Sequence, residues 1–294
     1  MPGPSSARTS ATTLLLSVLA LCAFAANSLF CRLALRDGAI DPVSFTQIRL
    51  ASGALVLLPI MLANSRIRPR FTWRRDWRPA LALFVYAIGF SLAYLALSVG
   101  AGALILFGTV QLSMIGLGLL KGDRPGPLGW LGLLLAFAGL AYLVAPGVSA
   151  PPLWAAALMG LAGLAWGVYS AMGKGEPEPI YATARNFLLT LPGVLLLTAA
   201  QPAARHLSGE GVALALASGV VASGAGYVVW YLALRKLSHL AASVGQLSVP
   251  VLATLGGAVF LGEGLTARVL IATAVILGGI VVATRLGRHG ATSR

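Results

Sequence analysis

One stretch of this chain occurs twice, as Gly89-Phe90-Ser91-Leu92-Ala93-Tyr94-Leu95-Ala96-Leu97 and again as Gly226-Tyr227-Val228-Val229-Trp230-Tyr231-Leu232-Ala233-Leu234. Five of the nine positions are identical in the two copies. The same tripeptide follows each copy, as Gln111-Leu112-Ser113 and as Gln246-Leu247-Ser248. The pattern predicts that the chain is built from two related halves.

The composition is that of a membrane protein. Of the 294 residues, 58% are hydrophobic and only 10% are charged, whereas a soluble domain carries about 25% charged residues. The net charge of +13 lies mainly in the connections between apolar runs, where basic residues determine topology and anchor lipid headgroups. Because no aromatic-basic RNA motif accompanies these residues, we expect membrane lipids and no nucleic acid as partners.

Ten apolar runs are long enough to cross a bilayer, which takes about 20 residues. We therefore predict an all-α polytopic membrane protein with ten transmembrane helices. The Gly219 and Ser223 pair, four residues apart, predicts a close approach of two of these helices. The predicted spans are approximately 11–31, 43–64, 79–99, 101–120, 128–145, 152–173, 180–200, 211–234, 240–261 and 266–284.

Each half holds five predicted spans, so the second half must enter the membrane upside down relative to the first. We expect a first repeat over residues 11–146 and a second over residues 152–286, within a single membrane domain. Inverted repeats around a site at the bilayer midplane are typical of secondary transporters. One side of this topology holds 15 Lys and Arg residues and the other holds 4. This bias predicts that both termini are cytoplasmic.

Short motifs recur at matching places in the two halves. They are Phe24-Ala25-Ala26-Asn27 with Arg32, Trp166-Gly167-Val168-Tyr169 with Lys174, Phe45 with Arg49, Tyr181 with Arg185, Gly122-Asp123 and Gly262-Glu263. These motifs resemble the EamA domains of the drug/metabolite transporter superfamily over essentially residues 11–286, although Phe24, Ala25 and Tyr169 depart from the family's Trp-Gly-x-Asn signature. The resemblance implies a ten-helix transporter of small metabolites, often an exporter in a bacterial-type inner (plasma) membrane, and is most similar to the YddG-type aromatic amino-acid exporters.

Polar and aromatic residues inside the spans are the candidates for substrate binding. An amino acid needs hydrogen-bond partners for its charged groups and an apolar wall for its side chain. Interhelical hydrogen bonds are the alternative for the glutamines, and an interfacial position is the alternative for Tyr86. The hydrogen-bonding candidates are Asn27, Gln111, Tyr169 and Gln246, and the wall candidates are Tyr86, Phe90, Tyr94, Trp166, Tyr227 and Trp230. Pro250, near the middle of the ninth predicted span, is a candidate gate or hinge, or else a static bend.

Charges inside the predicted spans are few. Arg49 and Arg185 are the only ones well inside, and we expect them to reach the interface or to cap carbonyls. Asp123 and Glu263 stand at helix ends, where we expect them to pair with basic side chains or turn amides. No carboxylate lies in the middle of a span, so no residue is available for proton exchange.

The predicted function is export of small amphiphilic metabolites, most simply aromatic amino acids, by alternating access that is facilitated and not proton-coupled. A broad-specificity drug or metabolite exporter and a lipid-flipping protein are the alternatives. The sequence holds no arrangement of residues typical of an enzyme. Its three histidines are not clustered, so we expect no metal and no cofactor. The expected partners are the small-molecule substrate and membrane lipids, and we expect the chain to act as a monomer.

Overall fold

The structure is a computed structural model that describes residues 11–63, 73–120, 122, 125–147, 149–173, 176, 178–200, 206–237 and 245–283. Within these ranges the helices form ten rods, because α8, η2 and α9 run on without a break over Gly209–Leu234. The elements are α1 (Ala11–Arg36), α2 (Pro42–Ala63), α3 (Trp73–Ala93), α4 (Val99–Leu120), α5 (Pro127–Val144), α6 (Leu153–Gly173), α7 (Pro179–Ala200), α8 (Gly209–Ala217), the π-helix η2 (Ser218–Ala225), α9 (Gly226–Leu234), α11 (Ser248–Leu261) and α12 (Ala267–Val281).

Six of the rods are long and apolar enough to cross a membrane, and two shorter apolar helices, α11 and α12, follow them. Large apolar side chains such as Phe137 and Phe260 are exposed on the outside of the bundle, as expected where helices face lipid. The helix α2 carries polar residues in its first half. Its Thr46, Arg49 and Ser52 are all buried, so these groups face protein and not hydrocarbon. The chain is a multi-pass membrane protein.

The helix boundaries differ from the prediction around the first repeat's third and fourth spans. The predicted span 79–99 is wrong at both ends, because α3 covers Trp73–Ala93 and a turn follows it before α4 begins at Val99. The side chain of Arg32 stabilises this turn by donating hydrogen bonds to the carbonyls of Tyr94 and Leu95, at 2.9 and 3.0 Å. Hydrophobicity alone could not reveal the turn, since its residues are as apolar as those of the helices.

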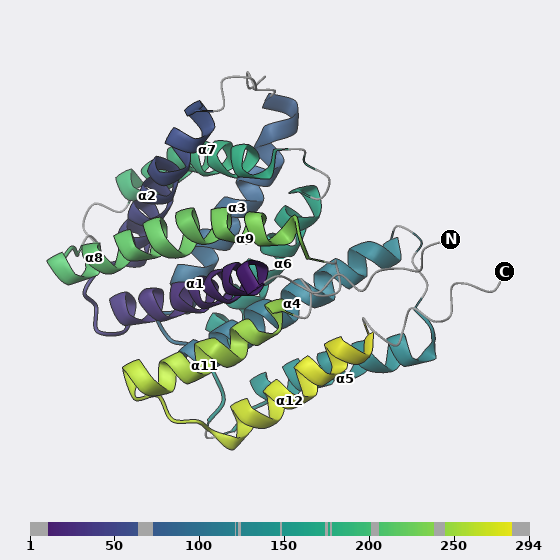
Figure 1. The fold of residues 1–294 in the computed structure, drawn as a ribbon. Coiled ribbons are helices and arrows are strands. Elements are labelled where there is room, and N and C mark those ends of the chain that lie inside the picture. The colour runs from purple at the N-terminus through teal and green to yellow at the C-terminus, as the bar shows by residue number, and fades with distance from the viewer. Residues whose placement is uncertain are drawn as a thin grey trace, which may run out of the picture.

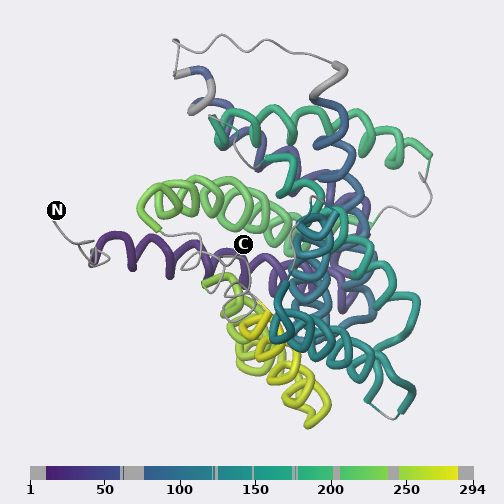
Figure 2. Tube along the Cα trace, turned by 90° about the vertical axis from the view of Figure 1, so that its right-hand side faces the viewer, coloured from purple at the N-terminus to yellow at the C-terminus, as the bar shows by residue number. Residues whose placement is uncertain are grey.

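The rods pack as a layered bundle (Figure 1). The pair α2 and α7 forms one edge and the pair α5 and α12 forms the other, with α1, α3, α4, α6, α9 and α11 between them. In Figure 2, α1 lies between the rod that ends in α9 and the helix α11, and both of these neighbours contact it. The interior of the bundle is lined by α1, α3, α6, the rod of α8, η2 and α9, and the buried face of α2.

Small residues allow the closest helix contacts. A Cβ atom on Gly279 of α12 would lie 2.6 Å from the backbone nitrogen of Ala136 and 2.7 Å from the carbonyl oxygen of Gly132, both on α5. At Gly219 of η2, a Cβ atom would collide with Ser52 and with the carbonyl of Arg49. The close approach predicted from Gly219 and Ser223 is thus confirmed, and it fixes η2 directly against α2.

Candidate functional site

Aromatic rings from four helices meet inside the bundle. The ring of Trp166 on α6 lies 4.7 Å from that of Tyr86 on α3, and 5.6 Å from that of Tyr227 on α9, centroid to centroid. Such spacings are those of favourable ring packing. We call this group, with the polar side chains described below, the central cluster. It comprises Phe24, Asn27, Arg49, Tyr86, Phe90, Trp166, Tyr169, Ser218, Ser223 and Tyr227.

Arg49 places a positive charge in the middle of this cluster. It is only 2% exposed. Its Nη2 donates to the Tyr86 hydroxyl at 3.0 Å and its Nε donates to Ser223 Oγ at 3.2 Å. The guanidinium also lies over the ring of Phe90, at 5.1 Å. Its Nη1 has no hydrogen-bond partner among the described residues. The expectation that Arg49 reaches the interface or caps carbonyls is therefore wrong.

Asn27 extends the polar part of the central cluster. Its Oδ1 accepts a hydrogen bond from Ser218 Oγ at 2.7 Å, and its Nδ2 donates to the Tyr86 hydroxyl at 3.5 Å. A string of polar groups consequently runs from Ser218 through Asn27 and Tyr86 to Arg49 and ends at Ser223. It joins α1, α2, α3 and η2 across the interior of the bundle.

Arg185, the counterpart of Arg49 in the second half, has a different environment. Its Nη2 lies 3.1 Å from Oδ1 of Asp76 on α3, and the Asp76 side chain is 1% exposed. Arg185 thus has a carboxylate partner inside the protein. The next residue, Asn186, donates from Nδ2 to the hydroxyl of Tyr169 at 3.5 Å, which links this pair to the central cluster. The sequence prediction missed Asp76, because the predicted span began after it.

The structure brings together Asn27, Tyr86, Phe90, Trp166, Tyr169 and Tyr227 among the predicted site residues. Trp230 lies at the edge, with its ring 5.8 Å from that of Phe24. Tyr94 stands in the turn after α3 and not within a helix, and its ring lies 4.8 Å from that of Phe90.

The two predicted glutamines lie apart from the central cluster in the contacts that the structure describes. Gln111 is buried in the middle of α4, whereas the half-buried Gln246 precedes the first residue of α11 by two positions. Within the described ranges neither amide forms a hydrogen bond. Pro250 is the third residue of α11, and its role as a gate or hinge stays a prediction. At that position its missing N–H costs no intrahelical bond within α11.

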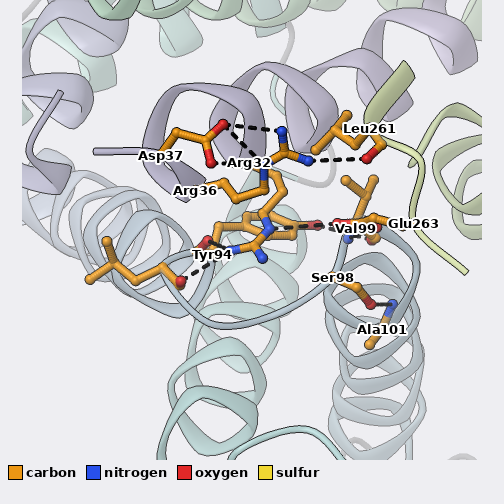
Figure 3. A network of polar contacts seen from close by, with 10 residues as sticks. Arg32, Arg36, Asp37, Tyr94, Ser98, Val99, Ala101, Leu261 and Glu263 are labelled. Carbon is orange, nitrogen blue, oxygen red and sulfur yellow. Dashed lines mark hydrogen bonds and ion pairs between the residues drawn. The ribbon is translucent and has the colours of Figure 1, made fainter. Parts of the chain in front are cut away.

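A second polar network ties one end of the bundle together (Figure 3). The Nε of Arg32 lies 3.5 Å from Glu263 Oε1, and Glu263 Oε2 accepts from the backbone N–H of Val99 at 2.8 Å. Arg36 pairs with Asp37 and donates to the carbonyl of Leu261 at 3.0 Å. The ends of α1 and α11 and the start of α4 are thereby held together, at what we call the tied end. The pairing predicted for Glu263 is confirmed, while Asp123 lies outside the described residues.

Several residues of the central cluster were missed from the sequence. Phe24 drew notice only as part of a family motif and Ser223 only as part of a helix contact, while Ser218 carries no distinctive signal, because apolar and small residues are common throughout the spans. Arg49 did carry one, since an ionisable residue inside a membrane span is by default a candidate for function. In the described part of the chain, no group of three or more metal-ligating side chains comes together.

Comparisons with known proteins identify the family of this chain. Residues 153–285 match the EamA-like transporter family. A Pseudomonas aeruginosa protein described as uncharacterized is 53% identical over 278 residues, which cover 94% of this chain and 96% of the relative. The chain belongs to the EamA-like transporter family. An Archaeoglobus fulgidus protein described as an uncharacterized transporter is 25% identical over 84% of this EamA-like chain and 90% of its own length.

One solved crystal structure has the same fold as this EamA-like protein. It superposes with a TM-score of 0.65 at 23% sequence identity and covers 98% of this chain and 100% of its own. At this identity the likeness concerns the fold alone. The family is one of membrane transporters and not of enzymes.

Proposed function

We propose that this EamA-like transporter moves small amphiphilic metabolites, most simply aromatic amino acids, through the central cluster. One observation carries the proposal: aromatic rings from α1, α3, α6 and α9 surround hydrogen-bonding groups in the interior of a membrane protein. Apolar walls with a few convergent polar groups are what a small ligand of this kind requires. Asn27, Tyr86, Trp166, Tyr169 and Tyr227 are the proposed contacts.

Two inverted repeats would provide the movement. The helix contacts support this view, because contacts in one half have equivalents in the other. Replacing each helix by its counterpart in the other half turns one observed contact into another. The contact of α3 with α6 corresponds to that of α1 with α9, and the contact of α4 with α6 corresponds to that of α1 with α11. We propose that the repeats rock about the central cluster. The tied end, on the side with fewer basic residues, is then the outward side and is closed in this conformation.

Transport is proposed to be downhill. A proton-coupled carrier needs a titratable group in the path that changes charge during the cycle. The described residues of the central cluster include no carboxylate and no histidine. Arg49 stays protonated near pH 7, so no proton-exchanging group is available there. Export across an inner membrane would then follow the substrate's own gradient.

Uptake of labelled L-tryptophan into proteoliposomes tests the proposal. The substrate should equilibrate without a pH gradient, and imposing a gradient should not drive accumulation. Liposomes that carry the Trp166→Ala and Tyr227→Ala variants should equilibrate at least about tenfold more slowly, because each loses a ring that contributes to the wall. Accumulation above the outside concentration, abolished by a protonophore, would overturn the downhill mechanism. If L-tryptophan entered empty liposomes as fast as liposomes that contain the protein, the substrate assignment would be overturned.

A further inference from the structure

We propose that Arg49 is the receptor for a carboxylate of the substrate, so that the central cluster selects aromatic acids over aromatic amines. This inference rests on the proposed transport function and names the chemical feature that the site recognises. Three observations carry it: the burial of Arg49, its Nη1 nitrogen without a partner among the described residues, and the contrast with Arg185.

The charge of Arg49 is not balanced by the described part of the protein. Its two hydrogen bonds to described residues go to neutral hydroxyls, those of Tyr86 and Ser223. Removing a charge from water costs several kcal/mol unless an opposite charge and further hydrogen bonds offset it. A guanidinium has five N–H donors in a planar fork, which matches the two oxygens of a carboxylate. The Nη1 group, buried and without a described partner, is a free arm of that fork.

In the second half of the chain, the equivalent arginine is paired with a carboxylate of the protein. Arg185 occupies the position equivalent to Arg49 and pairs with the buried Asp76 at 3.1 Å. The repeat that aligns Gly89 with Gly226 places Ala213 opposite Asp76. The position that supplies a carboxylate to Arg185 is therefore occupied by a methyl group in the other half. Arg185 thus has a carboxylate partner from the protein itself, whereas Arg49 is available to bind the carboxylate of a ligand.

The surroundings of Arg49 define the rest of the ligand. The rings of Tyr86 and Phe90 lie within 5.3 and 5.1 Å of its guanidinium, so a bound carboxylate would place an attached aromatic group among the rings of the cluster. The groups of the central cluster that could accept from an ammonium, such as Asn27 Oδ1 and the hydroxyl of Tyr86, carry no charge. The ammonium of an amino acid consequently contributes less to binding than its carboxylate.

Melting of the purified, detergent-solubilised protein tests this inference with three related probes. L-Tryptophan carries both charged groups, indole-3-propionate carries only the carboxylate, and tryptamine carries only the ammonium. For the wild type we expect both acids to raise the melting temperature and tryptamine to leave it unchanged. Arg49→Gln should weaken binding of both acids by roughly 10- to 100-fold, the loss expected for charge-assisted hydrogen bonds. The affinity of the Arg49→Lys variant for the acids should lie between those of the wild type and Arg49→Gln, because lysine keeps the charge and loses the planar fork of donors.

The exposed Arg235, in the turn after α9, provides the matched control. Arg235→Gln removes the same charge far from the central cluster and should keep the preference for acids. Equal stabilisation by tryptamine, or no stabilisation by either acid, in the wild type would overturn the inference even if the Arg49 variants do not fold. If tryptophan is not transported while both acids stabilise through Arg49, the transport proposal fails for this substrate and the inference stands.

Discussion

At the scale of single residues, Tyr86 is the central link of the string of polar groups, because its hydroxyl accepts hydrogen bonds from both Arg49 and Asn27. Tyr86→Phe should lower the free energy of unfolding by about 1–3 kcal/mol, since it leaves buried donors unpaired. Unfolding in mild detergent measures the change. Tyr142→Phe is the control, because Tyr142 is 42% exposed and its hydroxyl forms no hydrogen bond within the described ranges. Similar losses in both variants would contradict the importance of the string.

The glutamines offer a second residue-scale prediction, which separates binding from structure. If Gln111 and Gln246 contact the substrate during transport, changing either to Ala should lower transport efficiency about tenfold or more, at a cost of about 1–3 kcal/mol. Thermal stability should hold, since neither amide has a described partner to lose. Gln47→Ala is the control: this amide accepts from Thr198 Oγ1 at 2.9 Å, so its loss should reduce stability. Parallel losses of transport and stability at Gln111 would favour the structural alternative.

At the scale of helices, the α5–α12 contact depends on missing side chains. Gly279→Ala should destabilise the protein, because its Cβ would lie 2.6 Å from a backbone nitrogen of α5, which has little freedom to move. Gly278→Ala is a closely matched control, since nothing lies within 4 Å of a Cβ atom there. We expect a clear drop in melting temperature for the first variant and no drop for the second. Equal melting temperatures would show that α5 and α12 can separate without consequence.

The order of helices could be predicted from sequence, whereas the chemistry between them could not. Apolar length is a local property, so each predicted span has a corresponding rod. The environment of Arg49 is not local: its partner Ser223 stands 174 residues away. Nothing near Arg49 in the sequence distinguishes it from Arg185. Only the packing of α2 against α3 and η2, and of α7 against α3, shows that Arg49 lacks a carboxylate among the described residues while Arg185 has one.

At the scale of the whole molecule, orientation is the prediction that every statement about direction depends on. The excess of basic residues on one side, 15 against 4, predicts cytoplasmic termini. A fluorescent protein fused to the C-terminus should be bright, and an alkaline phosphatase in the same place should be inactive. Adding a single span before the phosphatase should restore its activity and serves as the control. An active phosphatase without that span would place the tied end on the cytoplasmic side.

The π-helix η2 has a consequence that concerns rotation about a helix axis. Each residue turns an α-helix by about 100°, so two residues five apart point about 140° away from each other. The i→i+5 winding of Ser218–Ala225 instead lets Ser218 and Ser223 serve the same interior, one facing Asn27 and the other Arg49. Rewinding one residue from π to α would twist α9 against α8 while the rod stayed intact. Tyr227 and Trp230 would then rotate about the axis of the rod. The rod could therefore move these side chains by twisting, without any displacement of the helix as a whole.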